Sequence, residues 1–166
     1  MSWIEVHLAV NHLPVIGTWV AAALLAWGVL VKKEDVRRVA LQVLVLVALS
    51  AVPAYLSGSR AEESAEHLSG VSSADVGDHE EAAGIALGSC LLLGLSASAA
   101  LLLFRQPRQV PLPWLGGVLV LAVLCSGVLA WTARLGGRIR HPEIRDVGAA
   151  FAPDRSREED RCSRYG

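Results

Sequence analysis

Residues 39–59 read VALQVLVLVALSAVPAYLSGS and contain no Asp, Glu, Lys or Arg. Three further stretches share this property, at residues 6–31, 82–104 and 109–133. A helix needs about 20 mainly apolar residues to cross the hydrocarbon core of a bilayer, and each stretch is long enough. The strands of a membrane β-barrel are shorter and alternate in polarity, which these stretches do not. The sequence therefore predicts an all-α protein with four membrane-spanning helices.

The polar segments between these stretches are short, so we expect an integral membrane antiparallel four-helix bundle. Residues 1–135 are expected to form this bundle in contact with lipid, and residues 136–166 a polar, partly disordered tail. Gly84 and Gly88 lie one turn apart on the third helix, which indicates a close helix contact or, alternatively, room for a flat cofactor. A homo-oligomer is also compatible with this pattern. The formal net charge of −1 argues against nucleic acid as a partner.

Basic residues in short loops predict the orientation in the membrane, because they favour the cytoplasmic side. Two of the loops are basic, and they contain Lys32, Lys33, Arg37, Arg38, Arg105 and Arg108. The loop at residues 59–81 is acidic, so both termini are expected on the outer side, in the periplasm of a bacterium with the protein in its inner membrane. Several arginines that follow the fourth helix disagree with this orientation, namely Arg134, Arg138, Arg140 and Arg145. The early loops are given more weight, because the first helix usually dominates.

All five histidines are expected at this outer end: His7 and His12 on the first helix, His67 and His79 in or after the second loop, and His141 after the fourth helix. Antiparallel topology alone brings them to one side of the membrane, and His12 and His79 lie at similar depths on separate helices.

A helical wheel separates the two histidines of the first helix. His7, Asn11 and Thr18 fall within about 40° of one another and form a polar stripe, at about 100° per residue. His12 points about 140° away from His7 on the same wheel. On the third helix, His79 heads a face of small residues, which continues through Ala83, Ala86 and Cys90.

Three chemistries could use these residues. The first is haem b, with His12 and His79 as iron ligands from separate helices and His7 as the substitute for His12. Asn11 could then support a ligand, and Arg138 and Arg140, with His141 nearby, could meet the propionates. The second is a zinc or copper site that combines His67, His79 or His141 with acidic residues of the second loop. The third is proton or quinone handling by a histidine.

Each of these groups also has an ordinary structural interpretation. A histidine near a membrane interface is often just an amphipathic residue, an acidic loop is often only solvated, and arginines can contact lipid phosphates. The three cysteines suggest packing residues, Cys90 and Cys125, and one tail thiol, Cys162. No nucleophile motif, phosphate loop, HExxH or CxxC pattern occurs, so an electron carrier or subunit is favoured over a stand-alone enzyme. A non-redox structural subunit and an outward-facing metal-binding protein remain alternatives.

The chain resembles the uncharacterised bacterial four-span family called domain of unknown function 2231. The residues that carry the resemblance are His7, the run His12-Leu13-Pro14, His79 at the start of the third helix, the pair Gly136-Gly137, and His141. The chain departs from the family pattern at Leu13, where an aromatic residue is usual, and at Pro142, which replaces a glycine. The resemblance implies haem binding and association with a membrane redox partner or a larger complex.

Overall fold

The computed structural model describes residues 2–65 and 73–140, which are almost entirely helical. Its elements are α1 (Trp3–Val10), α2 (His12–Leu30), α3 (Glu34–Ala65), α4 (Ser73–Leu103) and α5 (Leu112–Arg140). Four segments are long and apolar enough to cross a membrane: Trp3–Leu30, Glu34–Ala61, Ser73–Leu103 and Leu112–Ile139. The first of these segments combines α1 and α2. The all-α fold with four candidate spans is therefore confirmed.

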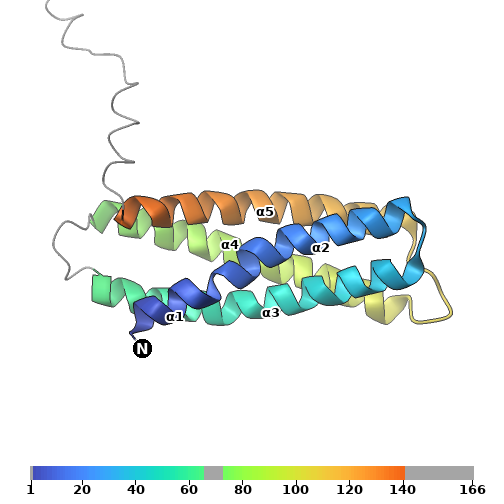
Figure 1. Ribbon diagram of the computed structural model, residues 1–166, viewed down its shortest axis with the longest axis horizontal. Coiled ribbons are helices and arrows are strands. Elements are labelled where there is room, and N and C mark those ends of the chain that lie inside the picture. The colour runs from blue at the N-terminus through green and yellow to red at the C-terminus, as the bar shows by residue number, and fades with distance from the viewer. Residues whose placement is uncertain (1, 66–72, 141–166) are drawn as a thin grey trace, which may run out of the picture.

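The four spans form an antiparallel bundle (Figure 1). Helix α2 packs against α3 and α5, and α4 also packs against α3 and α5, so each long helix has two neighbours. Alanine dominates the buried contacts, which allows the backbones to approach closely. Buried core residues include Ala21, Ala40, Ala97, Ala100 and Ala122, together with Leu25, Leu41, Leu44, Leu93 and Leu115.

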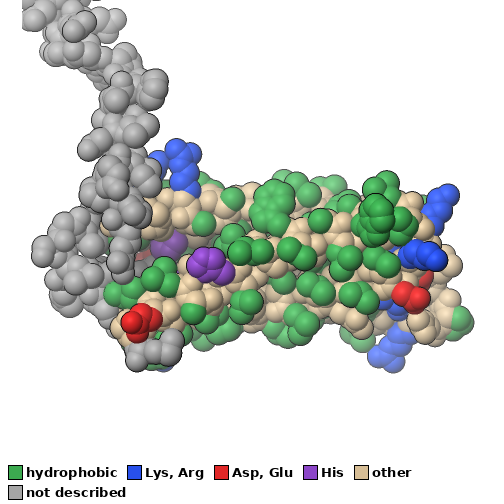
Figure 2. All heavy atoms as spheres, viewed as in Figure 1, with side chains coloured by type: hydrophobic (Ala, Val, Ile, Leu, Met, Phe, Trp, Pro, Cys, Tyr) green, Lys and Arg blue, Asp and Glu red, His purple; other side chains and the backbone are tan. Residues whose placement is uncertain are grey.

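The outer surface of the bundle is apolar along its middle. Val20, Leu46 and Leu95 are 56%, 65% and 69% exposed, respectively. Figure 2 shows charged side chains gathered at the two ends of the bundle, with a long apolar stretch between them on this face. Such a surface would be unfavourable in water and matches the hydrocarbon core of a bilayer. The four candidate spans and this apolar surface indicate a multi-pass membrane protein.

The first span is broken at Asn11, between α1 and α2. Pro14 lacks a backbone N–H and cannot donate to the carbonyl of Val10, the last residue of α1. Beyond the break, α1 packs mainly against α3, whereas α2 contacts both α3 and α5. The break in the first span thus separates α1 from α5, and the bundle is more open at the end that holds the N-terminus.

The opposite end of the bundle is closed by a network around Glu34. Its carboxylate lies 3.5 Å from Arg37 Nη1 and 3.2 Å from Arg38 Nε, the latter as an ion pair without hydrogen-bond alignment. The same carboxylate accepts a hydrogen bond from the backbone N–H of Val110 at 3.2 Å. Arg37 is buried and donates from Nε to the Gly28 carbonyl at 3.1 Å. These contacts join the connection between α2 and α3 to the connection between α4 and α5.

Two expectations about the bundle need correction. Gly84 and Gly88 are exposed, and an added Cβ at either position would meet no described atom within 4 Å, so they make no helix contact within this chain. The close helix contacts occur instead at Gly17 against Val47 and at Gly94 against Ala48. The expected tail began at residue 136, but α5 continues to Arg140. Residues 141–166 lie outside the described part of the chain.

Candidate functional site

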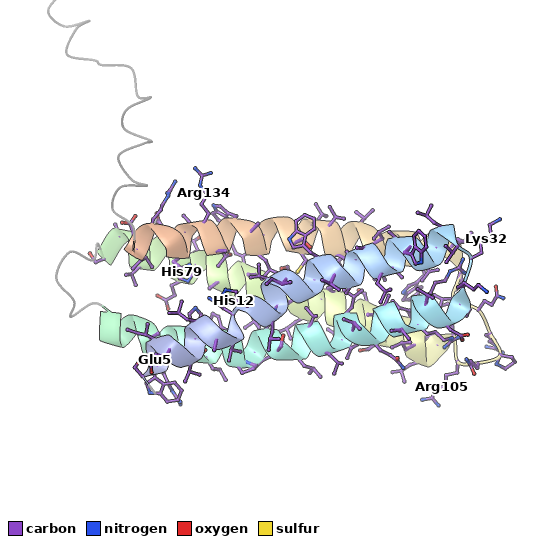
Figure 3. All side chains as sticks on the ribbon, viewed as in Figure 1. Glu5, His12, Lys32, His79, Arg105 and Arg134 are labelled. Carbon is purple, nitrogen blue, oxygen red and sulfur yellow. The ribbon has the colours of Figure 1, made fainter. Side chains whose placement is uncertain are left out.

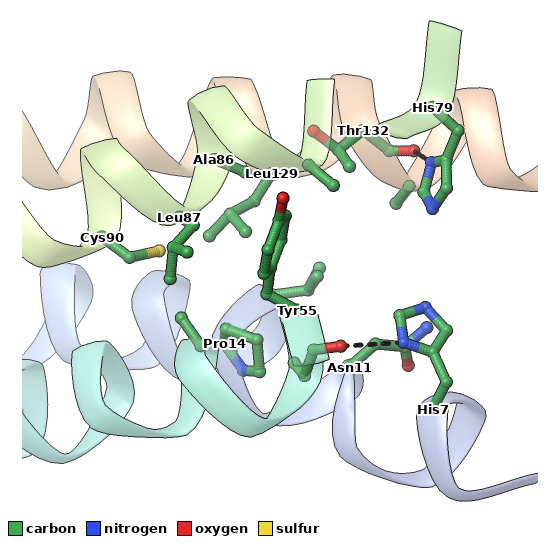
Figure 4. Close-up of a pocket in the computed structure, with 15 residues that line it drawn as sticks. His7, Asn11, Pro14, Tyr55, His79, Ala86, Leu87, Cys90, Leu129 and Thr132 are labelled. Atoms are coloured by element: carbon green, nitrogen blue, oxygen red, sulfur yellow. Dashed lines mark hydrogen bonds between the residues drawn. The ribbon is translucent and has the colours of Figure 1, made fainter. Parts of the chain in front are cut away.

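A cavity lies in the half of the bundle that contains the N-terminus (Figure 4). The cavity is partly open and has about 90 Å³ of space for water-sized molecules; its total empty space, open solvent at the mouth included, is about 540 Å³. The walls are mostly apolar and include several alanines. The residues that line it come from all four spans: His7, Asn11, Pro14, Val15, Ala51, Ala54, Tyr55, His79, Ala83, Ala86, Leu87, Cys90, Leu129, Thr132 and Ala133.

His7 enters the cavity from α1, and α3 fixes its position. The Nδ1 atom of His7 lies 3.0 Å from the backbone carbonyl of Ala54 and 3.4 Å from Ser57 Oγ. The ring lies directly against Gly58, where an added Cβ would be 3.0 Å from His7 Cε1. Glycine at position 58 therefore permits the close approach of the imidazole to α3.

His79 enters the cavity from α4, and α5 fixes its position in the same way. Its Nδ1 atom lies 3.1 Å from the backbone carbonyl of Thr132. An added Cβ on Gly136 would be 3.0 Å from His79 Cε1. The hydroxyl of Thr132 is satisfied separately, because it donates to the carbonyls of Ala82 and Val128 at 3.1 Å and 3.0 Å.

The two hydrogen bonds determine which nitrogen of each ring carries a proton. A carbonyl oxygen can only accept a hydrogen bond, so Nδ1 must be the protonated nitrogen in His7 and in His79. In a neutral imidazole the other nitrogen, Nε2, then carries a lone pair. Both rings line the same cavity, and in Figure 4 they face each other across it. The site therefore offers two Lewis-basic nitrogens, and this tautomer is the one that metal-binding histidines adopt.

The two histidine sites are built to the same plan. In each, a histidine near the start of a helical hairpin donates a hydrogen bond to a backbone carbonyl on the second helix of that hairpin. The ring also packs against a glycine that lies one turn after the carbonyl residue on the same helix. Ala54 and Gly58 contact His7 in this way, and Thr132 and Gly136 contact His79. The first two spans and the last two spans thus act as equivalent halves, with the cavity between them.

His12 does not take part in this arrangement. It is exposed, and its Nδ1 lies 2.7 Å from the Leu8 carbonyl of the preceding turn. It is not among the residues that line the cavity. His12 and His79 do lie in the same half of the bundle, as expected, and Figure 3 shows both. The structure brings His79 together with His7 rather than with His12, because the direction of a side chain around the helix, and not its depth alone, decides what it faces.

Asn11 lines the cavity beside the break in the first span. Its Oδ1 atom is buried and has no hydrogen-bond partner in the described part of the chain. Thr18, the third member of the polar stripe, is fully buried and donates to the Pro14 carbonyl at 2.6 Å. The stripe of His7, Asn11 and Thr18 therefore faces the bundle interior, as expected for polar groups at membrane depth.

Only some of the other expected site residues lie in the described part of the chain. Arg138 is half-buried on α5, at the same end as His79, whereas the side chain of Arg140 and all of His141 lie outside the described residues. His67 also falls in the segment 66–72, which is not described. Within residues 2–65 and 73–140, no three or more His, Cys, Asp or Glu side chains form a group that could hold a metal ion. The acidic metal site proposed for the second loop thus finds no support in its described part.

Several residues of the site were missed by the sequence analysis: Tyr55, Gly58 and Thr132. Tyr55 extends across the cavity from α3 in Figure 4. Gly58 follows Ala54 by one turn, as Gly136 follows Thr132, but this repeat is too short to recognise without the histidine contacts. The sequence did predict the face of small residues on α4 beside His79. In the structure, Ala83, Ala86 and Cys90 all line the cavity.

Comparisons of the chain with protein-family models, with curated proteins and with solved structures found no match. The resemblance to domain of unknown function 2231 therefore stays a prediction. What is known of the site comes from its own residues.

Proposed function

We propose that this membrane protein binds haem b, with His7 and His79 as the two axial ligands, and that it transfers electrons at the end of the bundle where the N-terminus lies. The observation that carries the proposal is the pair of imidazoles that share one cavity. Each is tethered through Nδ1 to a backbone carbonyl, at 3.0 Å and 3.1 Å, so that each Nε2 is available.

The number of ligands favours haem over a bare metal ion. Structural zinc sites take four protein ligands and catalytic zinc sites three, but this cavity contributes two histidines and belongs to no larger described group. Haem iron needs only two protein ligands, because the porphyrin provides the four nitrogens in its plane. When bound, haem supplies a reversible one-electron couple. The quinone alternative is weaker, because a quinone carbonyl needs hydrogen-bond donors and each Nε2 is an acceptor.

The walls of the cavity suit an apolar, flat molecule, since Ala83, Ala86 and Ala133 leave space between α4 and α5. The empty space of about 540 Å³ includes open solvent, so haem would also occupy the mouth, and Tyr55 or α1 must move to admit it. Helix α1 can move more easily than the rest of the bundle, because none of its residues is buried. Arg138 and Arg140 are the proposed partners of the propionates, through charge-assisted hydrogen bonds.

Within this proposal, the residues of the chain control ligand geometry and electronics. The Ala54 and Thr132 carbonyls orient the two rings and increase the basicity of each Nε2. The apolar walls exclude water from the cavity. The exclusion of water and the identity of the axial ligands would together set the reduction potential of the haem. Electrons would pass to a membrane redox partner or a larger complex.

The test is a spectrum of protein produced with a haem supply. A reduced-minus-oxidised difference spectrum should show the α band of a six-coordinate b-type haem. His7→Ala and His79→Ala should each abolish this spectrum, whereas His12→Ala, a matched change on the same span, should retain it. No α band in the parent protein, or a band that both alanine variants retain, would overturn the proposal.

We also propose that the protein lies in a bacterial inner membrane with both termini in the periplasm. Lys32, Lys33 and Arg105 are exposed at the end opposite the cavity, which favours that end as the cytoplasmic one. Figure 3 shows Lys32 and Arg105 at this end, with Glu5 and Arg134 at the other. Reporter enzymes that are active on only one side of the membrane, fused after Gly166, would test the orientation; activity of a cytoplasmic reporter would contradict it.

A non-redox accessory subunit is the second candidate, and the exposed glycines favour it. Gly84 and Gly88 on α4, with Gly116, Gly117 and Gly127 on α5, have open space where a Cβ would be. In lipid, small residues allow helices of different chains to approach. Co-purification with other membrane proteins and no pigment would favour this function over haem binding.

A further inference from the structure

Two buried thiols lie beside the cavity. Cys90 on α4 and Cys125 on α5 are each 1% exposed, and their Sγ atoms are 3.5 Å apart. From the sequence, both are expected to be packing residues, because each lies inside an apolar stretch. Both are free thiols in this structure. A disulfide bond has an S–S length of about 2.05 Å, so a change of side-chain rotamer and a small helix movement would join them.

The two thiols differ in access. Cys90 lines the cavity, and Figure 4 shows its sulfur directed into it, whereas Cys125 is not a lining residue. Any reagent that arrives through the cavity therefore meets Cys90 first. Cys125 lies behind it, within reach of a modified Cys90.

Ser89 provides a polar partner for Cys125. Its single hydroxyl hydrogen can be donated to Cys125 Sγ at 3.4 Å or to the Ala86 carbonyl at 2.8 Å. A hydroxyl that donates to sulfur stabilises the negative charge that develops when a thiol acts as a nucleophile. This contact assigns the attacking role to Cys125.

We propose that Cys90 and Cys125 form a reversible redox site that hydrogen peroxide or a similarly small peroxide oxidises to a disulfide. The cavity has about 90 Å³ of space for water-sized molecules and therefore holds several of them, since one needs about 10–15 Å³. A peroxide has this size, whereas a protein thiol or a thioredoxin-like partner cannot enter. The polar atoms at the cavity wall can hydrogen-bond a peroxide on its way to Cys90; they include Asn11 Oδ1, which has no partner among the described residues.

The chemistry proceeds in two balanced steps. In the first, the sulfur of Cys90 attacks one peroxide oxygen, the O–O bond breaks, and the thiol proton leaves with the second oxygen as water, which gives a sulfenic acid. In the second, the sulfur of Cys125 attacks the sulfenic sulfur, the S–O bond breaks, and the hydroxyl takes the Cys125 proton to leave as water. Two thiols are oxidised, and one peroxide is reduced to two waters.

The disulfide would join α4 to α5, the hairpin that also holds His79 and Thr132. Cys90 lies on the same α4 face as His79, and Cys125 precedes Thr132 by about two turns of α5. Oxidation would therefore fix the spacing of the two helices at the histidine site. The proposed oxidation does not depend on haem, because it uses only the cavity and the thiols.

The experiment uses the full chain with Cys162→Ser, purified in lipid nanodiscs without haem and treated with increasing hydrogen peroxide. We expect the intact mass to fall by two hydrogen atoms, and a peptide that joins Cys90 to Cys125 to appear after digestion. A small membrane-permeant phosphine should reverse both changes. Two thiols that stay free, or Cys90 that proceeds to sulfinic acid without a disulfide, would overturn the proposal.

Single variants test the order of events. In Cys125→Ser, Cys90 should stop at the sulfenic acid and be trapped by a dimedone reagent; in Cys90→Ser, Cys125 should remain a thiol. Ser89→Ala should slow disulfide formation several-fold. The parent result decides the proposal even if a variant fails to fold. A second set of samples, produced with a haem supply, separates the two proposals: loss of the haem difference spectrum in His7→Ala, with disulfide formation intact in the same variant, shows that they are independent.

Discussion

His7 lies so close to Gly58 that a Cβ at position 58 would be 3.0 Å from its Cε1 atom. The imidazole of His79 has the same relationship to Gly136. In both cases the glycine is one turn after the residue whose carbonyl holds Nδ1. The position of each ring thus depends on a glycine in a different helix, and this dependence can be tested without changing either histidine.

Gly58→Ala and Gly136→Ala should each weaken haem binding by about tenfold or more, because a displaced ring loses its carbonyl partner, and such supporting contacts are worth about 10–100-fold in metal affinity. Haem titration followed by absorbance measures the effect. Gly84→Ala is the matched control, since its added Cβ meets no described atom within 4 Å. Equal haem affinity in all three variants would contradict this role of Gly58 and Gly136.

Gly94→Ala should destabilise the bundle by about 1–3 kcal/mol, the usual effect of overpacking. An added Cβ would collide with the Cβ of Ala48 on α3, which cannot rotate away. Unfolding in mixed detergent micelles gives the free energy. Gly88→Ala, on the same helix and facing open space, should be neutral or slightly stabilising. A Gly94→Ala variant as stable as Gly88→Ala would show that α3 and α4 are not so closely packed.

Glu34→Gln should lower the free energy of unfolding by about 1–3 kcal/mol. The change removes the negative charge beside the buried Arg37 and beside Arg38, although an amide can still accept from the Val110 N–H. Asp35→Asn is the control, because it removes an acidic residue from the same first turn at an exposed position. The prediction fails if both variants lose the same free energy of unfolding, because the loss would then reflect only the removal of an acidic residue from the first turn of α3.

Pro14→Ala should make the first span more continuous and lower haem loading. Alanine restores an N–H that can bond to the Val10 carbonyl, so α1 would continue along the axis of α2 and carry His7 away from Ala54. Amide hydrogen exchange across residues 10–14 should become slower. Pro53→Ala, which removes a proline within α3 instead, should leave that exchange unchanged. Unchanged exchange in Pro14→Ala would indicate that the break has another cause.

The choice between His7 and His12 shows where sequence reasoning stops. His12 was the expected iron ligand because its depth matches that of His79, although the helical wheel placed His7 in a stripe with Asn11 and Thr18. In the structure this stripe faces inward, and His12 is exposed. The depth of a side chain in the membrane depends on its position along the span, but its contacts depend on its direction around the helix. The helical wheel, which gives this direction, was therefore the better predictor of the histidine that faces the cavity.

The glycines give a second example. Gly84 and Gly88 have the spacing of a helix contact, yet they face away from the bundle, whereas Gly58 and Gly136 lie against the histidine rings. Spacing along one helix does not reveal which neighbour covers it. Similarly, Cys90 and Cys125 meet only because α4 and α5 are adjacent.

The amino-acid sequence alone determined the four spans, the antiparallel bundle and the end at which His7, His12 and His79 lie. These follow from the length and apolar character of each stretch, because a bilayer requires every span to satisfy its own backbone hydrogen bonds. Only the tertiary structure decided that His7 faces His79, that carbonyls of α3 and α5 hold them, and that two thiols lie beside their cavity. These relationships depend on how each helix is rotated against its neighbours, and that rotation is set by packing between residues distant in the chain.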